Sequence, residues 1–419
     1  MLNKIIKKIP KDFSIVFLFD IVSKLLMGIV SIFIIRILTK TEYAMDVKFN
    51  TISKLLLSIV GTGVATAFVR CATEHISRGN RFIYNLYKRT LILIMTIPVV
   101  VVVLLIPAIK EIYNVDAIII VFALIYGVFL AINRINQSYF QAKEKYTKSG
   151  LIDNIKNIII VFVIVILYFV SRTNRLNSVI VSYVVCTGIA FIIGLIIIKK
   201  EKKKEAEASL LDSSQTTFST IFKDGFWLII YFILLNLIDQ TDIIMLTKYV
   251  GSEGVASYGV ALKYYSLLLS LQGTLTTVLR VRTSKKEMVD NASDRKQFSR
   301  NWIKNTWKII TLGCIIIIVF ATPMMKILNG NTYNDAILAF KVFVVGVGIS
   351  YIFSPNVAVM MAAQKHKQLC LLAFVGLIIN ATINWFFLGT YGVVVAAVAT
   401  VVANAVINII SFVLIEKDR

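Results

Sequence analysis

Apolar residues occur in long runs along this chain, and short polar segments separate the runs. Most runs are about twenty residues long, the length that an α-helix needs to cross the hydrocarbon core of a bilayer. Length and hydropathy together predict an all-α integral membrane protein with about twelve transmembrane helices. The predicted spans lie near residues 13–38, 44–69, 88–109, 116–140, 151–171, 177–198, 222–247, 254–279, 305–327, 334–360, 368–389 and 391–414.

Basic residues are concentrated in alternate inter-helix segments. About thirty lysines and arginines lie in one set of segments and about six in the other. Because cytoplasmic loops carry the excess of basic residues, the bias predicts that both termini are cytoplasmic. The net charge of +22 therefore indicates topology and not nucleic-acid binding.

The chain also contains an internal repeat. Residues 55–62 read Leu-Leu-Leu-Ser, two residues, Gly-Thr, and the same pattern returns at 267–274. This and other matches in order predict two duplicated halves, 1–198 and 221–419, joined by a cytoplasmic linker at 199–220. Each half has an even number of spans, so we expect two six-helix bundles of the same orientation around a central cavity.

Composition excludes several function classes. Hydrophobic residues make up 58% of the chain, which leaves no ordinary soluble domain. Four cysteines and two histidines show no metal-binding spacing, so no metal site is expected. Motifs for phosphate-binding loops and for catalytic Ser/His/Asp sets are missing, and the outer loops are short. We therefore expect a protein that is not an enzyme.

Four of the basic residues inside the predicted spans suggest the chemistry of the substrate. A charge in hydrocarbon costs roughly 2.5–3.5 kcal/mol on insertion scales, so intramembrane cations are functional candidates. Together they would give a hydrated cavity a positive lining that suits a phosphate or diphosphate. The candidate substrate-binding residues are Lys24, Lys54, Arg134 and Lys263.

Three acidic residues in the spans are candidates for ion coupling or charge pairing. Asp20 lies four residues before Lys24 on the same helix face, so the two can form a pair with only a structural role. Asp239 and Asp242 lie in the seventh span and are candidates for proton or sodium coupling. An alternative for Asp242, as for Lys48 and Lys341, is that the side chain extends to the membrane interface.

Polar and aromatic side chains near these charges have two interpretations. Tyr264 and Tyr265 follow Lys263 directly, and their rings could stack on the faces of a sugar. Most aromatic residues in such proteins, however, belong to the membrane interface. Asn380 and Asn384 share one face of the eleventh span, which is typical of hydrogen bonding between helices.

Several short motifs resemble those of a known group of exporters. They are Tyr258-Gly259 with Ala261 and Lys263, Phe140-Gln141-Ala142 with Lys145, and Tyr391-Gly392 followed by Ala396-Ala397 and Ala399-Thr400. With these motifs and its twelve predicted spans, the chain resembles the multidrug/oligosaccharidyl-lipid/polysaccharide (MOP) exporter superfamily, which has a MATE-like fold, and within it the Wzx-type O-antigen flippases. The resemblance covers essentially the whole chain, and one departure is Ala44 after Glu42-Tyr43, where a glycine is usual.

The resemblance implies a flippase of the bacterial cytoplasmic (inner) membrane. Its substrate would be an undecaprenyl-diphosphate-linked oligosaccharide, an O-antigen or other polysaccharide repeat unit, moved to the outer leaflet by alternating access. No cofactor is implied, but coupling to a proton, sodium or the membrane potential stays open. Membrane lipids, a polysaccharide polymerase and a chain-length regulator are the implied partners.

Three alternatives remain. A lipid II flippase shares the lipid diphosphate, so only substrate tests separate it. A cation-coupled multidrug exporter of the same superfamily should favour acidic residues in its cavity, and the excess of lysine counts against it. A membrane-embedded O-antigen polymerase or glycosyltransferase needs a large outer loop or an acidic catalytic pair, and the short outer loops count against it.

Overall fold

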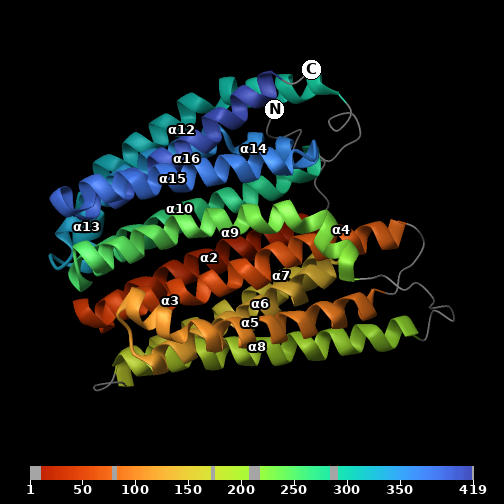
Figure 1. The fold of residues 1–419 in the computed structure, drawn as a ribbon, viewed down its shortest axis with the longest axis horizontal. Coiled ribbons are helices and arrows are strands. Elements are labelled where there is room, and N and C mark those ends of the chain that lie inside the picture. Colours follow the sequence, from red (N-terminus) through yellow and green to blue (C-terminus); the bar gives the residue numbers. More distant parts are fainter. Residues whose placement is uncertain (1–10, 78–82, 171–174, 207–217, 284–290, 418–419) are drawn as a thin grey trace. The chain divides into compact units, whose positions relative to one another are not determined.

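The computed structural model describes residues 11–77, 83–170, 175–206, 218–283 and 291–417. Within these residues the chain is almost entirely helical and contains no strand, which confirms the predicted all-α class. Contacts divide the chain into two compact units (Figure 1). Unit 1 comprises residues 1–33 and 49–233, and unit 2 comprises residues 34–48 and 234–419.

Unit 1 is built around one central helix. This helix, α6 (Ala117–Ala142), contacts all the other complete helices of the unit, because apolar side chains occur on all its faces. The unit also contains most of α2 (Lys11–Ile37), the end of α3 (Lys40–Leu56) and the start of α9 (Phe218–Tyr249). Its complete elements besides α6 are η1 (Leu57–Thr62), α4 (Gly63–Ser77), α5 (Tyr84–Tyr113), α7 (Tyr146–Val170) and α8 (Arg175–Ala206).

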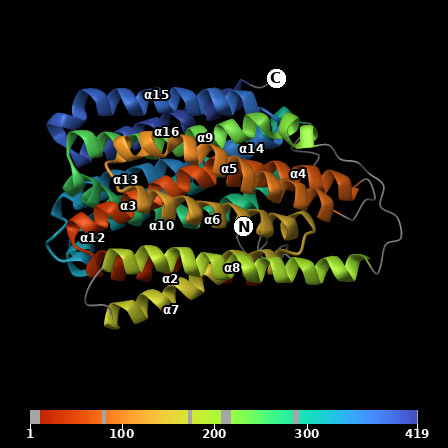
Figure 2. The same ribbon diagram turned by 60° about the horizontal axis from the view of Figure 1, so that its bottom comes forward.

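Unit 2 has a corresponding central helix, α16 (Val393–Glu416). Small residues along α16 let its neighbours approach closely, and α15 (His366–Tyr391) runs beside it in both views (Figures 1 and 2). The other complete helices of this unit are α10 (Ser252–Thr283), α12 (Ala292–Asn329), α13 (Asn334–Ile352) and α14 (Ser354–Ala362), and all of them contact α16.

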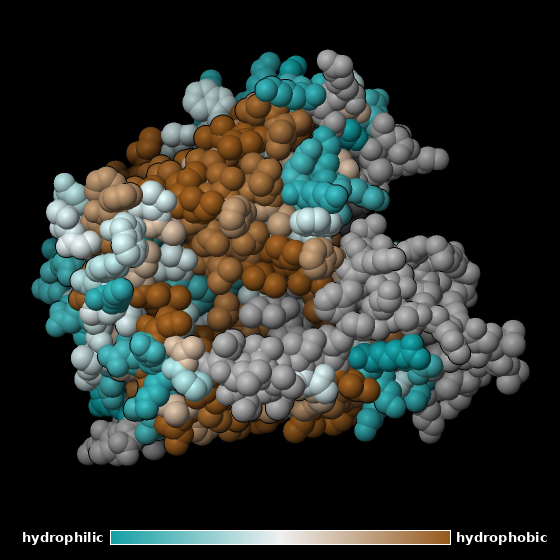
Figure 3. All heavy atoms as spheres, viewed as in Figure 1, coloured by the Kyte–Doolittle hydropathy of each residue, from teal (hydrophilic) through white to brown (hydrophobic). Residues whose placement is uncertain are grey.

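The hydropathy of the helices fits a multi-pass membrane protein. Among the described residues, eight helices are long and apolar enough to cross a bilayer. The four other predicted spans also fall on helices, namely α2, α3 to α4, α5 and α10. Figure 3 shows hydrophobic side chains over the middle stretches of the helices and hydrophilic ones toward their ends, as a bilayer requires.

Three local features differ from the sequence-based expectation. The span at 44–69 is not one regular helix, because a π-helical turn, η1, separates α3 from α4. The span at 334–360 breaks at Phe353, and the new helix α14 begins at Ser354 with Pro355 in its first turn. The expected linker at 199–220 starts as helix, since α8 continues to Ala206. The duplicated halves at 1–198 and 221–419 stay a prediction.

Two local geometries recur in both halves of the chain. The hydroxyl of Ser58 donates to the carbonyl of Leu55 at 2.8 Å, and that of Ser270 donates to Leu267 at 2.7 Å. A second shared geometry is the turn after α6 and after α14, in which Glu144 and Gln364 both have φ of 56°. The same backbone bonds close both turns, which are Schellman-type helix ends.

Gly127 lets α6 pack tightly within unit 1. A Cβ at this position would lie 2.9 Å from the carbonyl oxygen of Ser53 and 3.2 Å from the side chain of Leu56. The backbone oxygen cannot rotate away, so a larger residue forces the helices apart. This contact fixes the spacing between α6 and the segment that carries Lys54.

We predict that Gly127→Ala destabilises the protein by about 1–3 kcal/mol, because the added methyl group overpacks this contact. Gly389→Ala is the matched control, since a Cβ at Gly389 in α15 meets nothing within 4 Å. Thermal unfolding of both purified variants in one detergent checks the prediction. Equal melting temperatures for the two variants would contradict it.

Candidate functional site

Lys54 is an exposed cation within a predicted membrane span. It lies near the end of α3, and the π-helical turn η1 begins three residues later. Single π-helical turns inside α-helices occur frequently at functional sites. An ammonium group at this depth is stable only next to water, an anion or a ligand, because hydrocarbon cannot solvate it.

The other predicted cations of unit 1 have different surroundings. Lys24 on α2 is half-buried, and the side chain of Asp20 lies outside the described residues, so their pairing stays a prediction. Arg134 on α6 is half-buried and donates a hydrogen bond to the side chain of Gln137 one turn later. Arg134 is thereby oriented by a neutral acceptor and keeps its positive charge.

Lys263 and the two tyrosines that follow it belong to unit 2. Lys263 is half-buried on α10, and its membership of one cavity with Lys54 stays a prediction. Tyr264 is buried and donates from its hydroxyl to the side-chain oxygen of Asn329 at 2.9 Å. The ring of Tyr265 is buried and stacks on Phe343 with 4.4 Å between centroids. Both rings thus contribute to helix packing, and sugar stacking by them stays a prediction.

Asp242 lies at the centre of a buried polar cluster in unit 2. Its carboxylate is fully buried, so the expectation that it extends to the membrane interface is wrong, as is the same expectation for Lys48, which is 1% exposed. The physical reason is helix packing, since α9 presents Asp242 to polar groups of neighbouring helices and not to the bilayer surface.

Four neutral side chains from three helices donate to the Asp242 carboxylate. The Tyr258 hydroxyl on α10 donates at 2.5 Å, and the amides of Asn380 and Asn384 on α15 donate at 2.9 Å and 2.6 Å. The Thr400 hydroxyl on α16 also donates. The expected hydrogen bonding between helices by the two asparagines is confirmed. Tyr258 and Thr400 belong to motifs that resemble the family, but those motifs do not indicate that both side chains contact Asp242.

The Asp242 cluster has the chemistry of a site for a small cation. The carboxylate, two hydroxyls and two amide groups supply hard oxygen atoms, which suit a proton or an alkali cation. The side-chain oxygen of Asn384 has no hydrogen-bond partner among the described residues. The four side chains that donate to Asp242 are neutral, so the carboxylate gains from binding a cation that compensates its burial. Asp239, one turn earlier on α9, is half-buried.

Comparison with known protein families assigns the chain to one of them. The family described as "Polysaccharide biosynthesis protein" matches residues 9–280, which is more than half of the chain. The chain belongs to this family. The family match contains Lys24, Lys54, Arg134 and Lys263, the four candidate cations. No curated protein matches the sequence.

Solved structures of MOP superfamily transporters have the same fold. A MOP superfamily transporter from Pyrococcus furiosus is 12% identical to this chain, with a TM-score of 0.71. The alignment covers 97% of this chain and 95% of that transporter. The lipid II flippase MurJ, in an inward closed conformation, is 14% identical, covers 97% and 87%, and has a TM-score of 0.71. A multidrug resistance MATE family transporter in its inward-facing conformation is 12% identical, covers 94% of each chain, and has a TM-score of 0.72. The resemblance to MOP-type polysaccharide transporters is confirmed.

We predict that Asp242→Ala destabilises the protein by about 3 kcal/mol, because the substitution leaves several buried hydrogen-bond donors without an acceptor. Glu111→Ala is the control, since Glu111 is an exposed acid at the end of α5. Reversible unfolding in mixed micelles measures the difference. A loss of stability no larger than that of the control would show that the cluster contributes little to stability.

Proposed function

We propose that this chain is a flippase that moves an undecaprenyl-diphosphate-linked oligosaccharide from the cytoplasmic to the outer leaflet of the bacterial inner membrane. The family match and the transporter fold support the class. The observation that carries the proposal is Lys54, an exposed cation in the middle of a predicted span. An anion carried across the membrane is the natural counter-charge for such a residue.

The intramembrane cations have complementary tasks in this mechanism. Lys54 and Lys263 contact the diphosphate, because an ammonium group binds phosphate oxygens as a point charge. Arg134, oriented by Gln137, adds a planar set of donors that suits two phosphate oxygens. Lys24 contributes to the positive potential. The sugar passes through the hydrated cavity because hydrocarbon cannot satisfy its hydroxyl groups.

The membrane potential favours the proposed direction. In a cell that is negative inside, each negative charge moved outward gains about 2.3 kcal/mol per 100 mV. A diphosphate carries about two such charges, so the potential alone can drive a large accumulation in the outer leaflet. Release then requires weaker contacts between the basic side chains and the diphosphate, which the change of conformation in alternating access provides.

The Asp242 cluster is the proposed site of ion coupling. A proton or sodium ion that enters with its gradient neutralises the buried carboxylate, and its presence changes how α9, α10, α15 and α16 pack around it. The ion is transported together with the substrate in this scheme. The oxygen atoms around Asp242 suit both a proton and a sodium ion as ligand. Coupling of this kind adds to the electrical driving force on the substrate.

Related substrates and partners follow from the same chemistry. A lipid II flippase is the nearest alternative, because its substrate also has a polyprenyl diphosphate. The basic residues disfavour a cation-coupled multidrug exporter, since they repel cationic drugs. No enzymatic activity is proposed. A polysaccharide polymerase and a chain-length regulator are proposed to act on the translocated product at the outer leaflet.

We predict that Lys54→Ala or Lys263→Ala abolishes export, and that Lys54→Arg or Lys263→Arg partly restores it by keeping the charge. The measurement is display of long-chain polysaccharide on cells that lack the gene and express each variant at equal membrane levels. Lys110→Ala together with Lys326→Ala is the control, because both lysines are exposed at helix ends. Normal display by the Lys54→Ala, Lys263→Ala double variant would refute the cationic-cavity mechanism.

We predict that Asp242→Asn removes the dependence of transport on its coupling ion, because an amide cannot exchange a proton or neutralise sodium. Transport in membrane vesicles is measured with a sodium gradient or a pH gradient at constant membrane potential. The wild-type protein should accelerate with one of the two gradients and the variant with neither. An unchanged response of the variant would place coupling elsewhere.

A further inference from the structure

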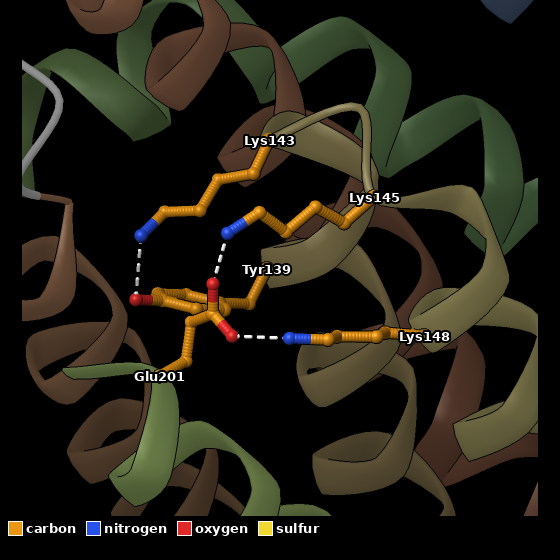
Figure 4. Close-up of polar contacts among 5 residues, drawn as sticks. All are labelled: Tyr139, Lys143, Lys145, Lys148 and Glu201. Carbon is orange, nitrogen blue, oxygen red and sulfur yellow. Dashed lines mark hydrogen bonds and ion pairs between the residues drawn. The ribbon is translucent and has the colours of Figure 1, made fainter. Parts of the chain in front are cut away.

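We infer that the ends of α6, α7 and α8 in unit 1 form a binding site for the phosphate headgroup of an anionic bilayer phospholipid. The site centres on Glu201, whose side chain is 5% exposed although it lies in the lysine-rich end of α8. Lys145 and Lys148 both donate to the Glu201 carboxylate, one to each oxygen (Figure 4). The sequence gives no hint of this burial, because the segment reads as a polar linker.

The lysines around Glu201 are held in place and are accessible. Lys145 and Lys148 have side chains that are 43% and 45% exposed, so both side chains border the surface while they contact Glu201. Lys143 points toward the same group of residues in Figure 4 and donates to the Tyr139 hydroxyl at 2.8 Å. Ammonium groups that are already ordered lose little rotamer entropy when an anion binds.

Positive charge is in excess at this site. Glu201 and the exposed Glu144 are the acids in or next to the turn, and together they do not balance Lys143, Lys145 and Lys148 of the turn and Lys202 beside Glu201 in the sequence. The ammonium nitrogen of Lys202 lies 4.3 Å from the ring centroid of Tyr84 on α5. An anion is therefore the expected ligand. The cationic members of the site are Lys143, Lys145, Lys148 and Lys202.

Two of the lysines are not needed to build the turn. The corresponding turn after α14 has the same backbone bonds and the same positive φ, with Ala363, Gln364 and Lys365 at the positions of Lys143, Glu144 and Lys145. In the same register Lys148 corresponds to the neutral Gln368. Lys143 and Lys148 are therefore additions to the shared turn geometry, which indicates a ligand and not a folding requirement.

An apolar stripe begins next to the lysines, so the ligand is an amphiphile and not free phosphate. Lys148 lies on the same face of α7 as Leu151, Ile158 and Phe162, which are 52%, 39% and 65% exposed. A similar exposed row on α8 leads to the exposed lysines 199 and 200. Its members are Val181, Val185, Ile189, Ile192 and Ile196.

This combination matches a phospholipid in the cytoplasmic leaflet. Acyl chains would lie along the apolar stripes, and the phosphate would meet the ammonium groups at the level of the headgroups. The positive-inside bias predicts that this end of unit 1 faces the cytoplasm, where anionic lipids attract basic segments. The phospholipid site is separate from the proposed transport of the glycan, so this inference does not depend on which lipid-linked glycan is moved.

The test measures lipid retained by the purified full-length protein in mixed micelles, by native mass spectrometry, with phosphatidylglycerol or phosphatidylcholine at equal concentration. The wild-type protein should bind phosphatidylglycerol preferentially. Lys145→Gln with Lys148→Gln should weaken that binding by about 30-fold, from the contribution of each lysine at a membrane surface. The control with the same change in charge is Lys110→Gln with Lys326→Gln, which should leave binding unchanged.

Two further arms keep the result decisive. If the double variant fails to fold because Glu201 loses both partners, the triple variant that adds Glu201→Gln removes the unpaired charge and should show the same loss of lipid. The inference is overturned if wild type binds both lipids equally or if the control loses lipid to the same extent. It is also overturned if a polyprenyl diphosphate displaces phosphatidylglycerol at equal concentration, since the site would then receive the transported substrate.

Discussion

The cost of placing a charged side chain in hydrocarbon governs this structure. Each charge within a span needs water, a set of hydrogen bonds or a ligand to be stable there. Asp242 is stabilised by four neutral donors from three helices, which makes its cluster a meeting point of unit 2. Lys54 is instead exposed beside a π-helical turn. The two solutions suit the two proposed tasks, in which the Asp242 cluster binds a small cation and Lys54 binds an anion.

The same constraint explains the surroundings of the two units' charged groups. Arg134 has a neutral acceptor in Gln137, so its charge stays available. Glu201 is buried only because Lys145 and Lys148 both contact it at the end of the helices, where water and headgroups are near. Opposite charges therefore meet at this helix end, whereas the Asp242 carboxylate is surrounded by neutral donors and Lys54 is exposed.

The number and placement of the spans could be predicted because hydrophobic length is a direct consequence of bilayer thickness. The orientation of individual side chains could not be predicted, since a helix that is apolar on most faces has no amphipathic period to indicate which face packs against which neighbouring helix. Asp242 illustrates this limit, because Tyr258, Asn380 and Thr400 come from segments up to 158 residues away. The π-helical turn at residues 57–62 could not be predicted either, because its mixture of apolar residues with Ser58, Gly61 and Thr62 also fits a regular α-helical span. Lys24, Lys54 and Lys263 were found by charge alone, which shows where a candidate lies but not what it touches.

The central claim is that the membrane cations serve an anionic, lipid-linked glycan. The most direct measurement is translocation by the purified protein in liposomes that contain a fluorescent polyprenyl-diphosphate oligosaccharide, with the membrane potential set by a potassium gradient. The account predicts that the glycan appears in the opposite leaflet, where a membrane-impermeant lectin detects it, at a rate that rises with the potential. Absence of glycan movement, together with potential-driven export of a cationic amphiphile by the same liposomes, would contradict it.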